Sequence, residues 1–260
     1  LRFATFIAFF PQLVAGPIVR AKELLPQFAA DIRFEWNRFT FGLSQVLWGF
    51  FKKVAVADSL APFVDQCFAA PESFSALHLA LGVFFYAFQI YCDFSGYSDI
   101  AIGLARIMGF DFPDNFRTPY FSKNFSEFWT RWHITLSSWL RDYLYIPLGG
   151  NRHGTFNTYR NLMLTMLLGG LWHGASWVFV FWGFLHGLYL VGQRLFSESY
   201  DRLLRTLRVP KVLQNGVDMV FVFLLTCLAW VFFRSPDFST ALTILGKIVA
   251  LDNLSPASII

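Results

Sequence analysis

The sequence has little charge, few cysteines and none of the short motifs that mark common soluble enzymes. Asp, Glu, Lys and Arg make up 15% of the 260 residues, whereas a soluble domain has roughly 25%. The mean hydropathy is +0.47, and 33 residues are phenylalanine. A soluble globule of this composition would lack the polar surface needed to cover its apolar mass. The composition therefore predicts a membrane protein.

Cysteine and motif patterns exclude several kinds of site. Cys67, Cys92 and Cys227 are far apart and form no CxxC pair, so neither a disulfide framework nor a zinc ribbon is indicated. No HExxH occurs and no two histidines lie three or four residues apart, so no metal site is predicted. GxSxG, P-loop and GxGxxG motifs are also absent. The net charge is +4, but no basic run with interleaved aromatics predicts a nucleic-acid partner.

Several apolar stretches are suited to a bilayer, where a spanning helix needs roughly 20 mostly apolar residues. Residues 176–192 and 217–233 are the clearest, and the others are 39–51, 77–92 continuing to 100–110, and the shorter 161–172. Residues 1–19 are broken by two prolines and a glycine, which predicts either a re-entrant segment or a helix end followed by a loop. We expect an all-α fold, a polytopic membrane helix bundle with re-entrant and interfacial helices.

Basic residues predict the orientation of this bundle. The connectors rich in Lys and Arg are 20–38, 117–160 and 194–211. Connectors 58–76 and 234–240 are poor in them. Cytoplasmic loops carry surplus Lys and Arg, so the basic connectors are expected in the cytoplasm and the others outside.

The run RWHITLSSWLRDYLYIPLGG, residues 131–150, carries unusual polar chemistry for such an apolar chain. Its candidate site residues are Arg131, Trp132, His133, Arg141 and Asp142. The pattern predicts a cytoplasm-facing interfacial helix from about Ser126 to about Tyr145, with Trp132, Leu136 and Trp139 on one face. By itself, His133 fits an interfacial histidine on such a helix better than a catalytic one.

A second histidine lies between two apolar runs in GGLWHGASW, residues 169–177. His173 is flanked by Trp172 and Gly174, and small residues leave room for a ligand or a backbone next to the imidazole. A buried imidazole is suited to accept a proton near neutral pH. The alternative is a histidine that bonds a backbone carbonyl and joins two helices. His186, in the middle of an apolar run, fits helix packing better than function.

Two carboxylates interrupt the apolar stretch YCDFSGYSDIAIGLA. Asp93 and Asp99 are functional candidates because ionisable groups at membrane depth are costly. The alternative is that either one pairs with an arginine such as Arg131 or Arg141 and fixes the fold. Spacing alone does not choose between a transporter and an intramembrane enzyme.

Four stretches taken together resemble the membrane-bound O-acyltransferase family, in its bacterial alginate O-acetyltransferase branch. They are FFPQLVAGPIVR (9–20), YCDFSGYSDIAIGLARIMGF (91–110), residues 115–152 and GGLWHGASWVFVFWGFLHG (169–187). The resemblance runs through nearly the whole chain in order. Family members are longer, and the chain starts at Leu1 and ends in SPASII, so we expect a single family domain over 1–260 that lacks some terminal helices.

The resemblance implies a helix bundle around a funnel that crosses the membrane. His173 matches the family's invariant histidine and His133 its second characteristic histidine. The implied function is transfer of an acyl group, most simply acetyl from acetyl-CoA, to hydroxyl groups of a polysaccharide such as alginate. The transfer is direct or passes through a periplasmic SGNH-type partner. The implied place is the bacterial inner membrane, and no bound cofactor is expected.

Two other functions stay open from the residues. In a transporter or scaffold subunit of a polysaccharide export machine, the histidines and carboxylates would line a path for an intact solute. In a sister branch of the family, the same chemistry transfers D-alanine to teichoic acid. PQLVAGPIVR favours the alginate-type branch.

Overall fold

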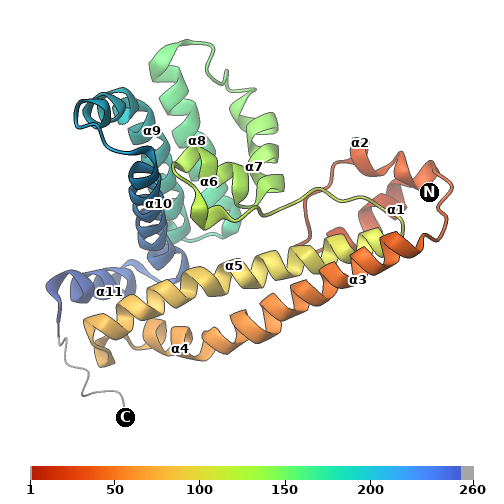
Figure 1. Cartoon of the computed structure of the whole chain (residues 1–260), viewed down its shortest axis with the longest axis horizontal. Coiled ribbons are helices and arrows are strands. Elements are labelled where there is room, and N and C mark those ends of the chain that lie inside the picture. The colour runs from red at the N-terminus through yellow and green to blue at the C-terminus, as the bar shows by residue number, and fades with distance from the viewer. Residues whose placement is uncertain (1, 253–260) are drawn as a thin grey trace. The chain divides into compact units, whose positions relative to one another are not determined.

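The computed structural model describes residues 2–252, and within this range the secondary structure is helical, without strands. The all-α prediction is therefore confirmed. The final residues, on which part of the fragment expectation depends, lie outside the described range. The helices, labelled in Figure 1, are α1 (Arg2–Ala8), α2 (Ala21–Leu24), α3 (Trp36–Phe50), α4 (Asp58–Ala69), α5 (Ala76–Ile107), α6 (Phe125–Arg131), α7 (Ile134–Leu140), α8 (Gly154–His173), α9 (Trp177–Thr206), α10 (Lys211–Arg234) and α11 (Phe238–Ala250).

The chain divides into two compact units. Unit 1 comprises the described part of 1–61 together with Phe88–Arg117 and Arg131–Trp139. Unit 2 comprises Pro62–Ala87, Thr118–Thr130 and the described part of 140–260. The prediction of one family domain over the whole chain stays a prediction.

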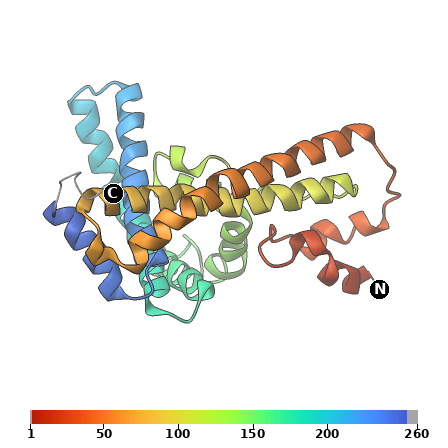
Figure 2. The ribbon, with the colours of Figure 1, turned by 90° about the horizontal axis from the view of Figure 1, so that it is seen from below.

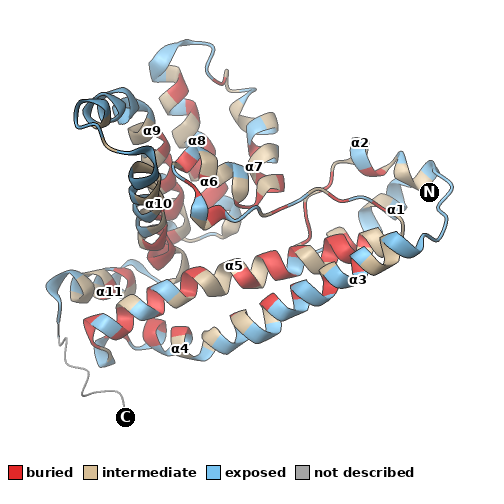
Figure 3. Cartoon of the chain, in the orientation of Figure 1, coloured by how far each residue is buried: buried red, intermediate tan, exposed pale blue. Residues whose placement is uncertain are grey.

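Helix α3 lies side by side with the part of α5 that belongs to unit 1, as Figures 1 and 2 show. Glycines permit this close packing. A Cβ at Gly49 would lie 2.6 Å from the carbonyl oxygen of Gly96, and one at Gly42 would lie 2.7 Å from that of Gly103. Any larger side chain would push the two backbones apart. Figure 3 shows buried residues where the two helices meet.

The N-terminal part of unit 1 folds back at the predicted break. α1 ends at Ala8, and Pro11 belongs to a short 3-10 turn. Gly16 lies so close to this turn that a Cβ would be 2.2 Å from the carbonyl oxygen of Pro11. The core beneath it is apolar and consists of Val19, Leu24, Ile102, Ala105, Phe110 and Phe112. The break in residues 1–19 is confirmed, while its depth in a bilayer stays a prediction.

Helices α8, α9 and α10 pack together in unit 2. α8 and α9 approach closely at glycines, since a Cβ at Gly170 would lie 2.3 Å from the carbonyl oxygen of Phe179 and one at Gly183 would lie 2.3 Å from that of Met166. α9 contacts α10 through the indoles of Trp182 and Trp230, whose ring centroids are 5.9 Å apart.

Three of the described helices are long and apolar enough to cross a membrane, namely α5, α9 and α10. They contain the predicted stretches 77–92 and 217–233 and all but the first residue of 176–192. Residues 39–51 and 161–172 lie in helices outside this set: α3 has only 15 residues before the π-helix Phe51–Ala57, and α8 is less apolar.

Candidate active site

The predicted continuous helix over 126–145 is wrong, because the chain breaks at His133. α6 ends at Arg131 and α7 begins at Ile134, and His133 has a positive φ of 42°. Two backbone hydrogen bonds to the segment 115–117 flank the break. The N–H of Arg117 donates to the carbonyl of Arg131, and the N–H of Ile134 donates to the carbonyl of Asn115, each at 2.9 Å. A left-handed backbone conformation costs free energy in a residue other than glycine, so surrounding contacts must stabilise it at His133.

The start of α6 also differs from the prediction. Asn124 is the capping residue, and its Oδ1 accepts the N–H of Glu127 at 2.8 Å. Glu127 in turn accepts the N–H of Lys123, the residue before the cap, at 2.8 Å. The cap lies two residues before the predicted Ser126.

Asn115 orients the imidazole of His133, and both side chains are buried. The Oδ1 of Asn115 accepts the backbone N–H of Thr135 at 3.2 Å and its hydroxyl at 2.8 Å. A backbone N–H only donates, so this atom is the oxygen. His133 Nδ1, 3.0 Å from the same atom, must therefore carry the proton. In the neutral imidazole the lone pair is then on Nε2, which is the nitrogen able to accept a proton.

Aromatic rings enclose His133. Phe94 stands edge-on at 4.6 Å between centroids and Phe116 is stacked at 6.4 Å. Trp132 is buried and packs edge-on against Phe116 at 5.1 Å. The predicted shared face of Trp132 and Trp139 does not survive the break, since Trp139 is 39% exposed. Arg131 is the last residue of α6, and its carbonyl accepts the N–H of Arg117.

Asp93 and Asp99 pair with lysines, which corrects the expectation of an arginine partner. Lys53 Nζ is 2.6 Å from Asp93, and Lys52 Nζ is 2.5 Å from Asp99. Lys52 also donates to the hydroxyl of Ser95 at 2.8 Å. Both lysines lie in the π-helix Phe51–Ala57. π-helical turns often occur at functional sites because they turn side chains out of the regular helical order.

His173 ends α8 in unit 2 and is half-buried among aromatic rings. Its ring is edge-on to Trp172, Trp182 and Phe233, with centroids 5.1, 5.2 and 5.0 Å away. Within residues 2–252, neither ring nitrogen has a hydrogen-bond partner, so the predicted alternative of a bond to a backbone carbonyl is not seen there. Both nitrogens therefore keep unused hydrogen-bonding capacity.

The glycines beside His173 make room for protein atoms. A Cβ at Gly174 would lie 2.8 Å from the ring of Phe179, and Gly170 lies against the Phe179 backbone. The sequence predicted that the small residues leave room either for a ligand or for a backbone next to the imidazole. These contacts favour the backbone, because a neighbouring segment packs against the glycines. They fix the imidazole at the α8 end against the start of α9.

His186 is fully buried in the middle of α9, among Phe128, Trp129, Trp182 and Tyr189. Neither ring nitrogen has a partner in the described part of the chain. Its ring centroid is 4.8 Å from that of Trp182, which also touches His173. This environment fits the predicted packing role.

Arg141 and Asp142 lie at the start of the π-helix Arg141–Tyr145. Arg141 Nε is 2.7 Å from Asp142 Oδ1, so the predicted site pair forms an ion pair between neighbours. Among the described residues, no group of three His, Cys, Asp or Glu side chains is placed to hold a metal ion.

Three residues were not among the predicted site residues, namely Asn115, Lys52 and Lys53. Asn115 opens the family-like stretch 115–152, in an irregular segment, but its role depends on contacts to residues 18–20 positions later. Lys52 and Lys53 are a visible signal, because two lysines interrupt an apolar stretch. Their pairing with carboxylates 40 and 47 positions later becomes evident only when α3 and α5 are packed together.

Comparisons with known proteins give a consistent result. A family model described as MBOAT, membrane-bound O-acyltransferase family, matches residues 1–234. A probable alginate O-acetylase AlgI of Azotobacter vinelandii is 49% identical over 239 residues, which are 92% of this chain and 46% of that protein.

Two further relatives are named for other acceptors. A peptidoglycan O-acetyltransferase of Helicobacter pylori is 43% identical over 257 residues, covering 98% of this chain and 48% of that protein. A teichoic acid D-alanyltransferase of Bacillus subtilis is 28% identical over 212 residues, covering 76% and 52%. The chain spans about half the length of the curated relatives it matches.

Proposed function

The chain belongs to the membrane-bound O-acyltransferase family, and from this membership we propose that it is part of an enzyme transferring acetyl groups to hydroxyls of a polysaccharide. The observation that carries the proposal is the high identity to relatives named for O-acetyl transfer. Alginate is the acceptor in one of those names and peptidoglycan in the other. The acceptor of this protein is therefore an acetylatable glycan outside the cytoplasm.

In the proposed mechanism, His173 is the general base. The acceptor hydroxyl gives its proton to a ring nitrogen of His173 as its oxygen attacks the carbonyl carbon of the acyl thioester. The carbon–sulfur bond then breaks, and the proton passes from His173 to the leaving thiolate. The free ring nitrogens and the aromatic surroundings support this role, because a site that excludes water limits hydrolysis of the thioester.

His133 is the proposed second catalytic group. The Oδ1 of Asn115 accepts the Nδ1 proton of His133, which fixes the tautomer and the orientation of the ring. Trp172 and Gly174 shape the surroundings of His173, and Arg131 and Trp132 shape those of His133. Asp93 and Asp99 hold the helices of unit 1 through their lysine partners, and Arg141 and Asp142 hold a turn of unit 2.

The remaining parts of the proposal concern the donor, the partner and the location. The donor is acetyl-CoA, an anionic thioester that the basic connectors would attract from the cytoplasm. A periplasmic SGNH-type protein receives or delivers the acetyl group on the outer side. The protein spans the bacterial inner membrane several times.

The test uses the full-length protein in its own host, at matched membrane levels. Ester-linked acetate on the secreted or cell-wall polysaccharide is measured for wild type, His173→Ala and His133→Ala. We expect a loss of 100-fold or more for each, since general acid–base catalysis contributes about 10²–10⁴-fold. Glu198→Gln, at an exposed position of α9, is the matched control and should keep full activity.

Isotope-labelled acetyl donor separates the competing functions. Label found covalently on the polysaccharide supports acetyl transfer, whereas an unlabelled exported polymer would point to a transporter or scaffold. The D-alanyl alternative rests on the 28% identical relative. D-Alanine esters in place of acetate would establish it.

A further inference from the structure

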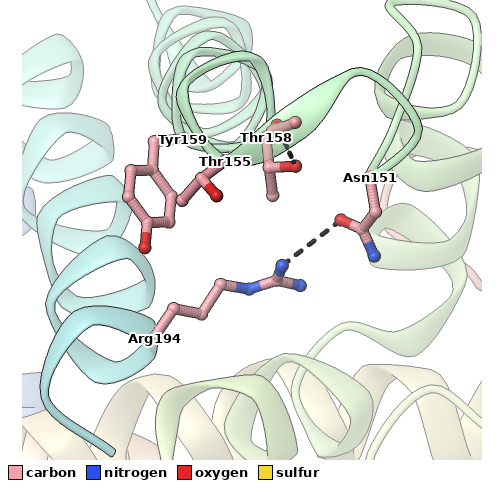
Figure 4. A pocket seen from close by; sticks show the side chains of 6 residues that line it. Asn151, Thr155, Thr158, Tyr159 and Arg194 are labelled. Atoms are coloured by element: carbon pink, nitrogen blue, oxygen red, sulfur yellow. Dashed lines mark hydrogen bonds between the residues drawn. The ribbon is translucent and has the colours of Figure 1, made fainter.

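A polar cavity of about 420 Å³ lies in unit 2, away from the aromatic surroundings of His173. Its lining residues are Asn151, Gly154, Thr155, Thr158, Tyr159 and Arg194. Figure 4 shows the guanidinium of Arg194 on one side and the hydroxyls of Tyr159 and Thr155 facing it from α8. The lining contains one cation, several neutral polar groups and no carboxylate.

Most of the hydrogen-bond donors of Arg194 are unused within the described residues. A guanidinium has five N–H donors, and that of Arg194 donates to Asn151 Oδ1 at 3.3 Å. No carboxylate pairs with it anywhere in residues 2–252. The hydroxyl of Thr158 already donates to the Gly154 carbonyl at 3.0 Å. The donors left for a ligand are therefore Arg194, Thr155 and Tyr159.

The loop that carries Asn151, on another side of the cavity, is held in place by hydrogen bonds. Asn161 is fully buried, and its Nδ2 donates to the carbonyls of Leu148 at 3.0 Å and Gly150 at 3.1 Å. Tyr145 donates to Asn151 Oδ1, the atom that Arg194 also contacts. Burial raises the pKa of the Tyr145 phenol, so it stays a donor at neutral pH. These bonds position Asn151, and through it the guanidinium of Arg194, in the absence of a ligand.

We propose that this cavity binds a phosphate group. Guanidinium recognises phosphate through paired N–H donors, and two further hydroxyl donors on the facing wall suit an ion with three or four oxygen acceptors better than a planar carboxylate. A cavity of this size is in the usual range for ligand sites, roughly 300–1,000 Å³. The phosphate comes from one of two sources. It belongs to the acyl donor, which rests on the proposed function, or to the headgroup of an anionic phospholipid.

The test measures binding without acetyl transfer, on the full-length protein in lipid nanodiscs. One arm titrates CoA, and the other compares retention of phosphatidylglycerol with that of phosphatidylcholine by native mass spectrometry. We expect Arg194→Gln to weaken one of the two by tenfold or more. Arg194→Lys should weaken it less, and Thr155→Val should weaken it by a few-fold. Arg202→Gln, exposed on the same helix, is the matched control and should bind like wild type.

Each outcome has a definite meaning. A loss of CoA binding alone assigns the site to the donor, and a loss of phosphatidylglycerol retention alone assigns it to the lipid. Equal behaviour of Arg194→Gln and Arg202→Gln with both probes overturns the site. If wild type fails to acetylate polysaccharide but still binds a probe through Arg194, the proposed function fails and the phosphate site stands.

Discussion

At the residue scale, the clearest feature is the buried contact between Asn115 and His133. A single amide oxygen accepts three donors and so decides which imidazole nitrogen carries the proton. The contact also explains the left-handed backbone of His133, since Thr135 and Ile134 give their N–H groups to Asn115 in place of a helical turn. Orientation by a neighbouring acceptor is what distinguishes this imidazole from one that merely fills space.

Removing the oxygen of Asn115 should affect activity more than it affects the amount of folded protein. We expect Asn115→Ala to lower polysaccharide acetylation by about 10–100-fold, because the tautomer and the ring orientation of His133 are no longer fixed. Asn115→Asp keeps an oxygen acceptor for the same donors and should recover part of the activity. Ester-linked acetate at matched membrane levels is the measurement. Equal losses in both variants would show that the amide acts only through its bond to Ser98.

Lys52 and Asp99 form the most enclosed ion pair described here, with side chains 10% and 22% exposed. We expect Lys52→Met to destabilise the protein by about 1–3 kcal/mol, since it leaves the half-buried carboxylate of Asp99 with its bond from Gln45 but without its charged partner. The double variant Lys52→Met with Asp99→Leu should recover most of that loss and most of the acetylation. Thermal unfolding in detergent measures the stability of both variants, and ester-linked acetate on the polysaccharide measures their activity. A stable but inactive double variant would assign Asp99 to the chemistry.

At the element scale, glycines decide how closely the helices approach. α3 and α5 meet at Gly42, Gly49, Gly96 and Gly103, where each missing side chain is replaced by the backbone of the opposite helix. Small residues at helix contacts are the usual means of close packing in membranes, where burial of apolar surface supplies little driving force. The close approach brings Lys52 within reach of Asp99.

Gly49→Ala tests the α3–α5 contact. The new methyl group would lie 2.6 Å from a carbonyl oxygen, so we expect the melting temperature to fall, with a cost of about 1–3 kcal/mol typical of overpacking. Gly246→Ala in α11 is the control, because no atom lies within 4 Å of its added Cβ. That change should be neutral or stabilising by up to about 1 kcal/mol, as alanine is the better helix former. Similar melting temperatures for the two variants would contradict the close packing.

At the scale of the whole molecule, three long apolar helices and their charged connectors define a membrane protein. α10 separates a basic connector on its N-terminal side from one poor in Lys and Arg on its C-terminal side. The positive-inside rule therefore predicts that the two ends of α10 lie on opposite sides of the membrane. Within this chain the three cysteines, Cys67, Cys92 and Cys227, are buried, so they contribute little to the labelling of an introduced cysteine.

Cysteine labelling tests this topology in whole cells with a permeable outer membrane. Pro236→Cys should react with a membrane-impermeant maleimide, and Arg205→Cys should react only after the inner membrane is opened. Both positions are exposed, so a difference reports the side of the membrane. Labelling of both in intact cells would contradict the crossing by α10.

The sequence by itself determined the class of the protein, its main apolar helices, its family and the two histidines to examine. These follow from composition, from the length of apolar runs and from motifs, all of which are local in the chain. Only the tertiary structure decided the break at His133, the proton on its Nδ1, the lysine partners of Asp93 and Asp99 and the cavity of Arg194. Each of these depends on groups far apart in sequence that meet only when helices pack, and no local pattern encodes which groups will meet.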